Sequence, residues 1–258
     1  MSSYKLNVEG AGSSIALLKS DKKASKKYTP MISLGEGSRS GFEELSLNKG
    51  ETLSMIPDIT KERDVFFVIG QSGSGKSYFV SNYAKEYKKL HSKRSIYVFS
   101  TLAEDKDGLD RIPKIIRIPL NADFTNDDII PTEEFKDSLV IFDDIDNIHD
   151  KKTKEVVWKY LNNFLQTGRH YKISLCITFH VGCAGASTKM ILNEATSITY
   201  FPATIGGRNL KYLLDSYLGM DKKQIDQVKK IDSRAITIIK CYPKVVLAER
   251  NVYILRND

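Results

Sequence analysis

Cysteine is scarce in this chain, and long hydrophobic runs are missing. The three cysteines among 258 residues, Cys176, Cys183 and Cys241, are too few and too scattered for a disulfide framework or a zinc cluster, and they fit a reducing compartment. No apolar run approaches the length of a membrane span, and the N-terminus lacks the hydrophobic core of a secretion signal. We therefore expect a soluble, intracellular protein without a membrane span.

Charge and size restrict the function less strongly. The 39 basic and 32 acidic residues leave a net charge of +7, which is compatible with a polyanionic partner and equally with an ordinary basic enzyme. Hydrophobic residues make up 41% of the chain, enough for the core of one large α/β domain with appendages or of two small domains.

A glycine-rich octapeptide is the most informative stretch. It follows the apolar run 64–69, which is dense in β-branched and aromatic residues, and it precedes residues 78–84, which can continue as a helix. Strand, glycine loop and helix in this order are the context of a phosphate-binding P-loop, because glycines let backbone N–H groups and the helix N-terminus face a triphosphate. The loop consists of Gly70, Gln71, Ser72, Gly73, Ser74, Gly75, Lys76 and Ser77. We expect Lys76 to reach the β- and γ-phosphates of ATP and Ser77 to offer its hydroxyl to Mg²⁺.

Two aspartates follow the buried-type run 138–142. A P-loop needs a carboxylate at the end of a neighbouring buried strand for the magnesium ion, and hydrolysis needs a base that orients the attacking water. We assign Asp143 to the magnesium and Asp144 to the water. Asp146 is a weaker candidate, whose pattern is more typical of a cap or turn residue.

The next apolar run, 173–179, is expected to end beside the γ-phosphate, because ligands bind at the carboxyl ends of parallel strands. Thr178 and His180 lie there, and one of them is a candidate sensor of the γ-phosphate. Hydrolysis also requires a cation on the developing charge, often an arginine from a neighbouring subunit. Arg169 is the most attractive candidate for this role in trans, with Arg208 and Arg234 as alternatives.

The order of the apolar runs predicts an α/β fold, a mostly parallel sheet with helices on both faces and antiparallel strands at the C-terminus. The sequence predicts a flexible arm with short β-prone pieces for residues 1–60 and the P-loop domain for residues 61–258. Helices are expected from the P-loop to about Leu90 and at 152–167, 189–195, 209–218 and 222–230. Strands are expected at 64–69, 95–100, 115–119, 138–142, 173–179, 198–201, 234–239, 244–248 and 252–255.

Four features together resemble a known family: the octapeptide GQSGSGKS, the run LVIFDD, the segment 165–170 before the strand ending at His180, and the tail 233–255. They are similar to the DNA-packaging ATPases of large double-stranded DNA viruses, the poxvirus-like branch of the FtsK-HerA superfamily of P-loop motors. The resemblance covers about Asp64 to Leu255, and the segment with Arg169 and the tail carry its specificity.

The resemblance implies a RecA-like core that assembles into a homo-oligomeric ring and pumps double-stranded DNA into a capsid. It also implies capsid or portal proteins as candidate partners, and the host cytoplasm, a viral factory or the virion as the location. The family's magnesium carboxylate maps to Asp143, and its trans-acting arginine to Arg169. The chain departs from the family at Asp144, where a glutamate is frequent, and at His180, where a glutamine is common.

Other functions remain open from the sequence. A small P-loop kinase would need an arginine-rich lid, and the arginines of this chain do not cluster. A GTPase is disfavoured because no Asn-Lys-x-Asp pattern follows the P-loop; Asn48-Lys49-Gly50 precedes it and lacks the aspartate. The non-enzymatic alternative is a nucleotide-gated assembly protein with little turnover, which Asp144 in place of glutamate keeps open.

Overall fold

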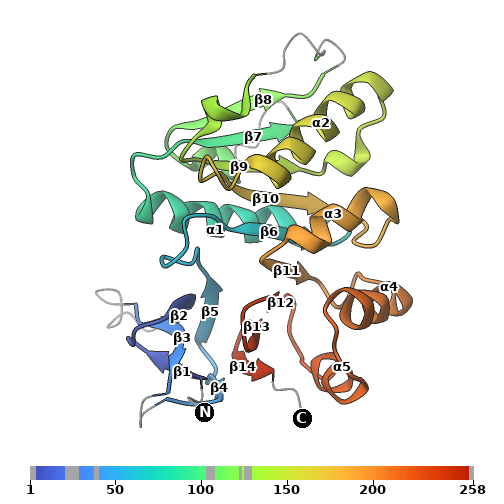
Figure 1. The fold of residues 1–258 in the computed structure, drawn as a ribbon. Coiled ribbons are helices and arrows are strands. Elements are labelled where there is room, and N and C mark those ends of the chain that lie inside the picture. Colours follow the sequence, from blue (N-terminus) through green and yellow to red (C-terminus); the bar gives the residue numbers. More distant parts are fainter. Residues whose placement is uncertain are drawn as a thin grey trace. The chain divides into compact units, whose positions relative to one another are not determined.

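The structure is a computed structural model that describes residues 4–20, 29–37, 41–102, 108–121, 124 and 130–255. The chain divides into two compact units (Figure 1). We call Glu62–Ala195 the P-loop unit, and Met1–Lys61 together with Thr196–Asp258 the flanking unit.

Five parallel strands form the sheet of the P-loop unit, in the order β6-β10-β9-β7-β8. Three of them are buried along their whole length, as expected for parallel strands with both faces covered. The edge strand β8 is half-exposed, in agreement with its edge-like sequence. The bounds are β6 (Val65–Ile69), β7 (Ile96–Ser100), β8 (Ile115–Pro119), β9 (Leu139–Asp143) and β10 (Ser174–Phe179).

The order of the strands differs from the sequence-based expectation in one respect. The strand of the Asp143–Asp144 pair is not the direct neighbour of the P-loop strand, because β10 pairs with both β6 and β9 and lies between them. Strands in a sheet are about 4.8 Å apart, so β6 and β9 are separated by roughly 10 Å. The ends of all three strands still meet at one edge because the strands are parallel.

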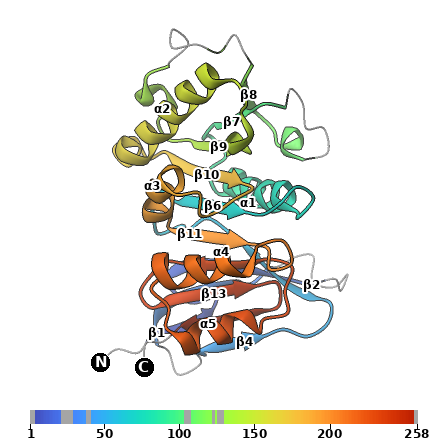
Figure 2. The same ribbon diagram turned by 90° about the vertical axis from the view of Figure 1, so that its right-hand side faces the viewer.

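Helices cover both faces of this sheet. Figure 2 shows α1 (Lys76–Leu90) on one face and α2 (Lys151–Thr167) with α3 (Ala186–Glu194) on the other. Asp150 caps α2 by accepting the N–H of Thr153 at 2.7 Å. The helix buries the stripe that its sequence predicts, and aromatic rings of α2 pack against β7 and β9. The stripe comprises Val156, Val157, Tyr160, Leu161 and Phe164. The described residues of this unit also form three short 3₁₀ turns: η2 (Leu109–Arg111), η4 (Thr132–Phe135) and η5 (Ile145–Asn147).

The flanking unit is built from antiparallel strands. One sheet has four strands in the order β1-β3-β2-β5, and the other strands pair in the order β11-β12-β13-β14-β4. Leu53 of β5 donates its N–H to the carbonyl of Glu249 at 2.7 Å, so the two sets of strands are joined. The first set comprises β1 (Tyr4–Val8), β2 (Ser13–Ser20), β3 (Met31–Glu36) and β5 (Glu51–Met55). The second comprises β4 (Glu44–Ser46), β11 (Ser197–Tyr200), β12 (Ile236–Ile239), β13 (Lys244–Ala248) and β14 (Asn251–Leu255).

Two helices follow β11 in the flanking unit. The first begins as α4 (Gly207–Tyr212) and continues as a π-helical turn, η6 (Leu213–Tyr217). The second, α5 (Lys222–Lys229), starts with a capping box formed by Asp221 and Gln224. The predicted helices 209–218 and 222–230 correspond to these elements.

The N-terminal residues differ from the flexible arm that their sequence suggests. In the described part of residues 1–60, five strands form, and this segment belongs to the same unit as residues 196–258. Some of these strands bury few residues; β1, for example, buries only Leu6 and Asn7, whereas β3 buries four of its six residues. Such strands carry little local signal, because pairing with distant segments stabilises them.

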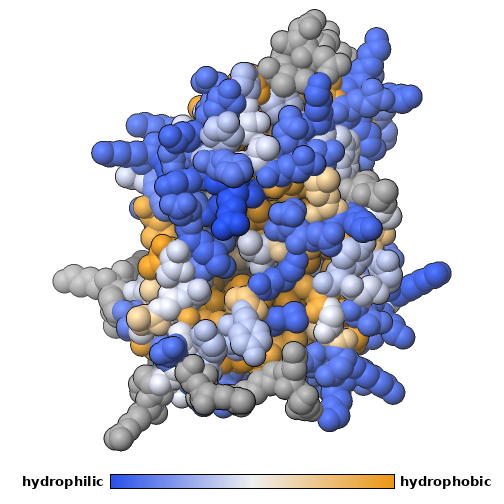
Figure 3. All heavy atoms as spheres, viewed as in Figure 1, coloured by the Kyte–Doolittle hydropathy of each residue, from blue (hydrophilic) through white to orange (hydrophobic). Residues whose placement is uncertain are grey.

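The exposed faces of the helices carry mostly polar and charged residues. On the face viewed in Figure 3, hydrophilic side chains cover most of the P-loop unit. Among the described residues, no helix combines the length and the hydropathy needed to cross a membrane.

Candidate nucleotide-binding site

The P-loop connects the end of β6 to the start of α1. Gly70 donates its N–H to the carbonyl of Phe179 at 3.0 Å, which ties the loop to the end of β10. Gly73 and Gly75 have φ angles of +75° and +109°, a left-handed conformation that favours glycine. No side chain caps α1, and its first turn contains no acidic residue. Its N-terminal amide groups therefore remain available to an anion such as a phosphate.

Lys76 is the charged centre of the loop. Its side chain is only 4% exposed, and its Nζ lies 2.8 Å from the carbonyl oxygen of Gly70 and 3.4 Å from that of Gln71. The same Nζ pairs with Asp144 Oδ1 at 3.3 Å. The buried ammonium group is thus held at the start of the glycine loop, between two loop carbonyl groups and the carboxylate of Asp144.

Asp143 ends β9 and is buried. Ser100 donates to its Oδ2 at 3.4 Å, and the Thr178 hydroxyl lies 3.1 Å from its Oδ1. Burial raises the pKa of Asp143, and the adjacent Asp144 charge raises it further, whereas the two hydroxyl groups act in the opposite direction. The carboxylate is therefore held in a fixed orientation.

Asp144 begins the turn after β9 in a left-handed conformation with φ +50°. Thr178 fixes this turn, because its Oγ1 accepts the Asp144 N–H at 2.8 Å and also lies 3.0 Å from Asp144 Oδ1. The Thr178 side chain is fully buried. Thr178 is thus engaged with the two aspartates, and His180 remains as the candidate with a more accessible ring.

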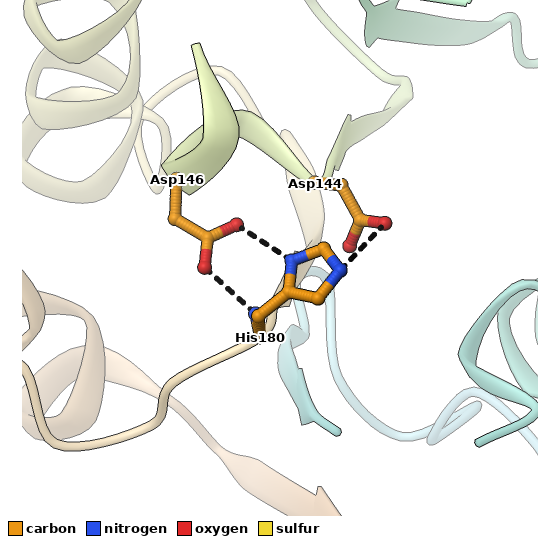
Figure 4. Close-up of side chains that lie close together, drawn as sticks. All are labelled: Asp144, Asp146 and His180. Carbon is orange, nitrogen blue, oxygen red and sulfur yellow. Dashed lines mark hydrogen bonds and ion pairs between the residues drawn. The ribbon is translucent and has the colours of Figure 1, made fainter. Parts of the chain in front are cut away.

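His180 follows β10 and lies between two carboxylates (Figure 4). Its backbone N–H donates to Asp146 Oδ2 at 2.7 Å, and its Nδ1 lies 3.3 Å from Asp146 Oδ1. Its Nε2 lies 3.6 Å from Asp144 Oδ2. The structure therefore brings Lys76, Asp143, Asp144 and His180 together at the carboxyl edge of the sheet.

The donor set at this edge fits a magnesium ion. Ser77 stands next to Lys76 on the first turn of α1 and is an exposed residue, and Asp143 offers a carboxylate. Hydroxyl and carboxylate oxygens are the hard ligands that Mg²⁺ prefers, with water and phosphate oxygens completing its shell.

Arg169 lies at the opposite edge of the same sheet. It follows α2 in the turn that leads into the amino end of β10, and its side chain is exposed. The whole length of β10 separates it from His180. The structure therefore does not bring Arg169 to the P-loop of its own chain. The alternatives Arg208 and Arg234 lie in the flanking unit.

Sequence reasoning missed two contributors. Ser100 lies at the end of β7, and nothing in the residues around it indicates a contact with Asp143. Asp146 lies in the turn η5, as its sequence pattern indicates, and it also binds His180 at two points, which the sequence did not indicate. The only sequence signal for this role is its place three residues after Asp143, at an edge where carboxyl ends converge.

Comparison with known proteins identifies a relative in a virus. No protein-family model matches the chain. The protein V3 of the Sputnik virophage, described as uncharacterized, is 39% identical over 220 residues, which cover 84% of this chain and 86% of V3.

Two solved structures share the fold. The genome packaging NTPase B204 of Sulfolobus turreted icosahedral virus 2, in complex with AMPPCP, matches 72% of this chain and 98% of its own, with a TM-score of 0.50 and 16% identity. The pCW3 conjugation coupling protein TcpA, with ATPγS, matches 91% of this chain and 77% of its own, with a TM-score of 0.51 and 13% identity. At these identities the likeness concerns the fold. The chain belongs to the family of the virophage protein V3, and its fold is the P-loop NTPase fold that B204 and TcpA share.

Proposed function

We propose that the protein is a magnesium-dependent ATPase that moves double-stranded DNA as a homo-oligomeric ring and packages a viral genome into a capsid. The observation that carries the enzymatic part is the meeting of Lys76, Asp143 and Asp144 behind a glycine loop. Phosphoryl transfer needs these three roles: a cation on the phosphates, a carboxylate near the metal and a group that orients water.

The residues of the chain would divide the work as follows. Lys76 exchanges the carbonyl oxygens of Gly70 and Gln71 and the carboxylate of Asp144 for phosphate oxygens when ATP binds. Asp144, released from Lys76, is then free to orient the attacking water. Ser77 and Asp143 would hold Mg²⁺, which would supply positive charge to neutralise the phosphates.

The DNA-related part of the proposal rests on similarity and charge. B204 is described as a genome packaging NTPase and TcpA as a conjugation coupling protein, and both activities transport DNA. The V3 relative is a virophage protein, which favours packaging over conjugation. A net charge of +7 suits contacts with phosphates without base reading. Capsid or portal proteins are the expected further partners, and the infected host cell is the expected location.

The position of Arg169 supports the ring in this proposal. An arginine at the amino edge of the sheet cannot reach the phosphates at the carboxyl edge of the same chain. If it completes a nucleotide site, that site belongs to a neighbouring copy. Arg169 is therefore our candidate for the cation supplied in trans.

The experiment that tests the enzymatic proposal is steady-state ATP hydrolysis by the wild type and by Lys76→Ala. We expect hydrolysis by the wild type and a loss of nucleotide binding or turnover in the variant. Lys85→Ala, an exposed lysine on the same helix, is the matched control and should retain wild-type turnover. Normal turnover in Lys76→Ala would refute the assignment of the P-loop.

The same assay separates the alternative functions. Tight binding of ATP without turnover in the wild type would favour a nucleotide-gated assembly protein, and transfer of phosphate to a small acceptor would favour a kinase.

A further inference from the structure

His180 is held by one carboxylate at two points. Asp146 Oδ2 accepts the backbone N–H of His180 at 2.7 Å, and Asp146 Oδ1 lies 3.3 Å from the ring Nδ1 (Figure 4). A carboxylate only accepts hydrogen bonds, so Asp146 Oδ1 pairs with Nδ1 only when this nitrogen carries a proton. Asn147 Nδ2 lies 3.1 Å from the same Nδ1 and could donate to it only if Nδ1 carried no proton. We assign the proton to Nδ1, because a hydrogen bond to the charged carboxylate is the stronger of the two.

The two contacts restrict the imidazole ring. The backbone bond fixes the end of β10 against the turn that contains Asp146, and the ring bond then selects the rotation of the side chain. The result is that Nε2 faces Asp144 Oδ2 at 3.6 Å. Asp144 in turn pairs with Lys76 at 3.3 Å. The Nε2 atom of His180 therefore faces the same carboxylate that contacts Lys76.

His180 is also joined to the P-loop through the backbone. The residue before it, Phe179, accepts the N–H of Gly70, the first residue of the loop, at 3.0 Å. A change in the loop on binding a phosphate therefore acts on the segment that Asp146 anchors. Asp146 therefore holds His180 from one side, and Asp144, which pairs with Lys76, faces its ring from the other side.

We propose that Asp146 is a positioning residue that orients His180 for discrimination between a nucleoside triphosphate and a diphosphate. The inference rests on the proposed function, because it requires a nucleotide at the P-loop, but it does not require turnover. Asp146 acts only through His180 and does not contact the nucleotide.

The test is the ratio of affinities for Mg²⁺–ATPγS and Mg²⁺–ADP, measured by calorimetry on the full chain. The variants are Asp146→Asn, His180→Ala and the double variant. Asp150→Asn is the matched control, because it removes the same charge from the same segment, and asparagine still caps α2. We expect Asp146→Asn and His180→Ala to lower the wild-type preference for ATPγS by about tenfold, a typical cost of a misplaced group in an active site. Asp150→Asn should keep the wild-type ratio.

The double variant separates positioning from a general structural role. If Asp146 acts through His180, the double variant has the same ratio as His180→Ala alone, because the two changes remove one interaction. A further loss in the double variant would overturn the proposal, as would an unchanged ratio in Asp146→Asn, an equal loss in Asp150→Asn or a wild type without preference.

A measurement on the wild type covers the case in which Asp146→Asn fails to fold. Nitrogen-15 NMR of the histidine rings, with His180 assigned by the His180→Ala variant, should show the Nδ1-protonated form. A proton on Nε2 alone would overturn the proposal. Absence of ATP hydrolysis in the wild type would instead contradict the proposed function. The role of Asp146 would then still be tested by the ratio of affinities for Mg²⁺–ATPγS and Mg²⁺–ADP, which does not require turnover.

Discussion

Thr178 shows how one hydroxyl group organises the candidate site at the scale of a single residue. It is fully buried, accepts the N–H of Asp144 and lies within hydrogen-bond distance of a carboxylate oxygen of both Asp143 and Asp144. A hydroxyl has one proton, so it can donate to only one of the two carboxylates at a time. The two aspartates are thus coupled through a shared donor.

We predict that Thr178→Val lowers kcat strongly and destabilises the P-loop unit, because the Asp144 N–H loses its acceptor. An unsatisfied buried donor costs about 1–3 kcal/mol of unfolding free energy. Thr178→Ser retains the hydroxyl and should stay close to the wild type in turnover. Thermal unfolding and ATP hydrolysis measure the two effects. Wild-type turnover in Thr178→Val would show that the hydroxyl does not position the aspartates.

Arg63 connects elements rather than single groups. Its Nη2 donates to the carbonyl of Phe164 at 2.7 Å, and its Nε donates to the carbonyl of Ile173 at 2.8 Å. The first carbonyl belongs to the end of α2, and the second precedes β10. The side chain therefore joins the helix, the strand and the start of β6 at the edge that carries Arg169.

We predict that Arg63→Ala lowers the free energy of unfolding by about 1.5–3 kcal/mol, the usual worth of a hydrogen bond from a charged group. Arg63→Lys should recover only part of this, because an ammonium group lacks the planar fork that reaches both carbonyls. Denaturant unfolding of both variants measures the difference. An Arg63→Ala variant as stable as the wild type would show that the C-terminus of α2 needs no cap.

Asp58 anchors the segment after β5 to β2 in the flanking unit. Its Oδ1 accepts the N–H of Ser14 at 3.1 Å and two hydrogen bonds from Thr60, and Lys61 pairs with Oδ2 at 3.2 Å. Burial alone would raise the pKa of Asp58, but the hydrogen bonds from Thr60 and the charge of Lys61 outweigh it, so the pKa lies below its usual value of 3.8.

A lowered pKa means that the ionised form stabilises the fold. This contribution is fully present above the unfolded-state pKa, about 3.9, and is lost as the pH falls through the lower folded-state value. We therefore predict that Asp58→Asn destabilises the protein near neutral pH by about 1 kcal/mol and that the difference shrinks below pH 3.8. Thermal unfolding of both proteins across pH measures it. A difference that does not depend on pH would contradict the role of the charge.

Local patterns were sufficient for the elements that position the site. The dense β-branched runs of β6, β9 and β10, the glycine loop and the apolar stripe of α2 are strong signals, and the structure contains each of these elements. The position of β10 between β6 and β9 was not predictable, because pairing depends on the crossover connections rather than on the strands themselves. The contact of Asp146 with His180 depends on the left-handed turn at Asp144, which no pattern in the sequence marks.

At the scale of the whole molecule, the proposed ring would make the sites of neighbouring copies interdependent. We predict that Arg169→Ala lowers turnover by about 10³-fold while ATP binding is retained, because an arginine of this kind acts on the transition state. Arg208→Ala, which removes one of the two alternative arginines, should leave turnover near the wild-type level.

A mixing experiment tests whether Arg169 acts in trans. Lys76→Ala subunits lack a working P-loop but retain Arg169, and Arg169→Ala subunits have the reverse defect. Mixed rings then contain some sites with an intact P-loop beside an intact arginine, so we expect partial ATP hydrolysis from two inactive proteins. A mixture that forms oligomers and stays inactive would contradict the trans assignment.

The measurement that tests the central claim most directly is the rate of ATP hydrolysis by the purified protein with and without long duplex DNA, at a protein concentration where light scattering gives its oligomeric mass. The account predicts an oligomer whose magnesium-dependent turnover rises several-fold with DNA, and Lys76→Ala provides the blank. An oligomer that binds ATP but hydrolyses none of it, with or without DNA, would contradict the proposal that this protein is a DNA-translocating motor.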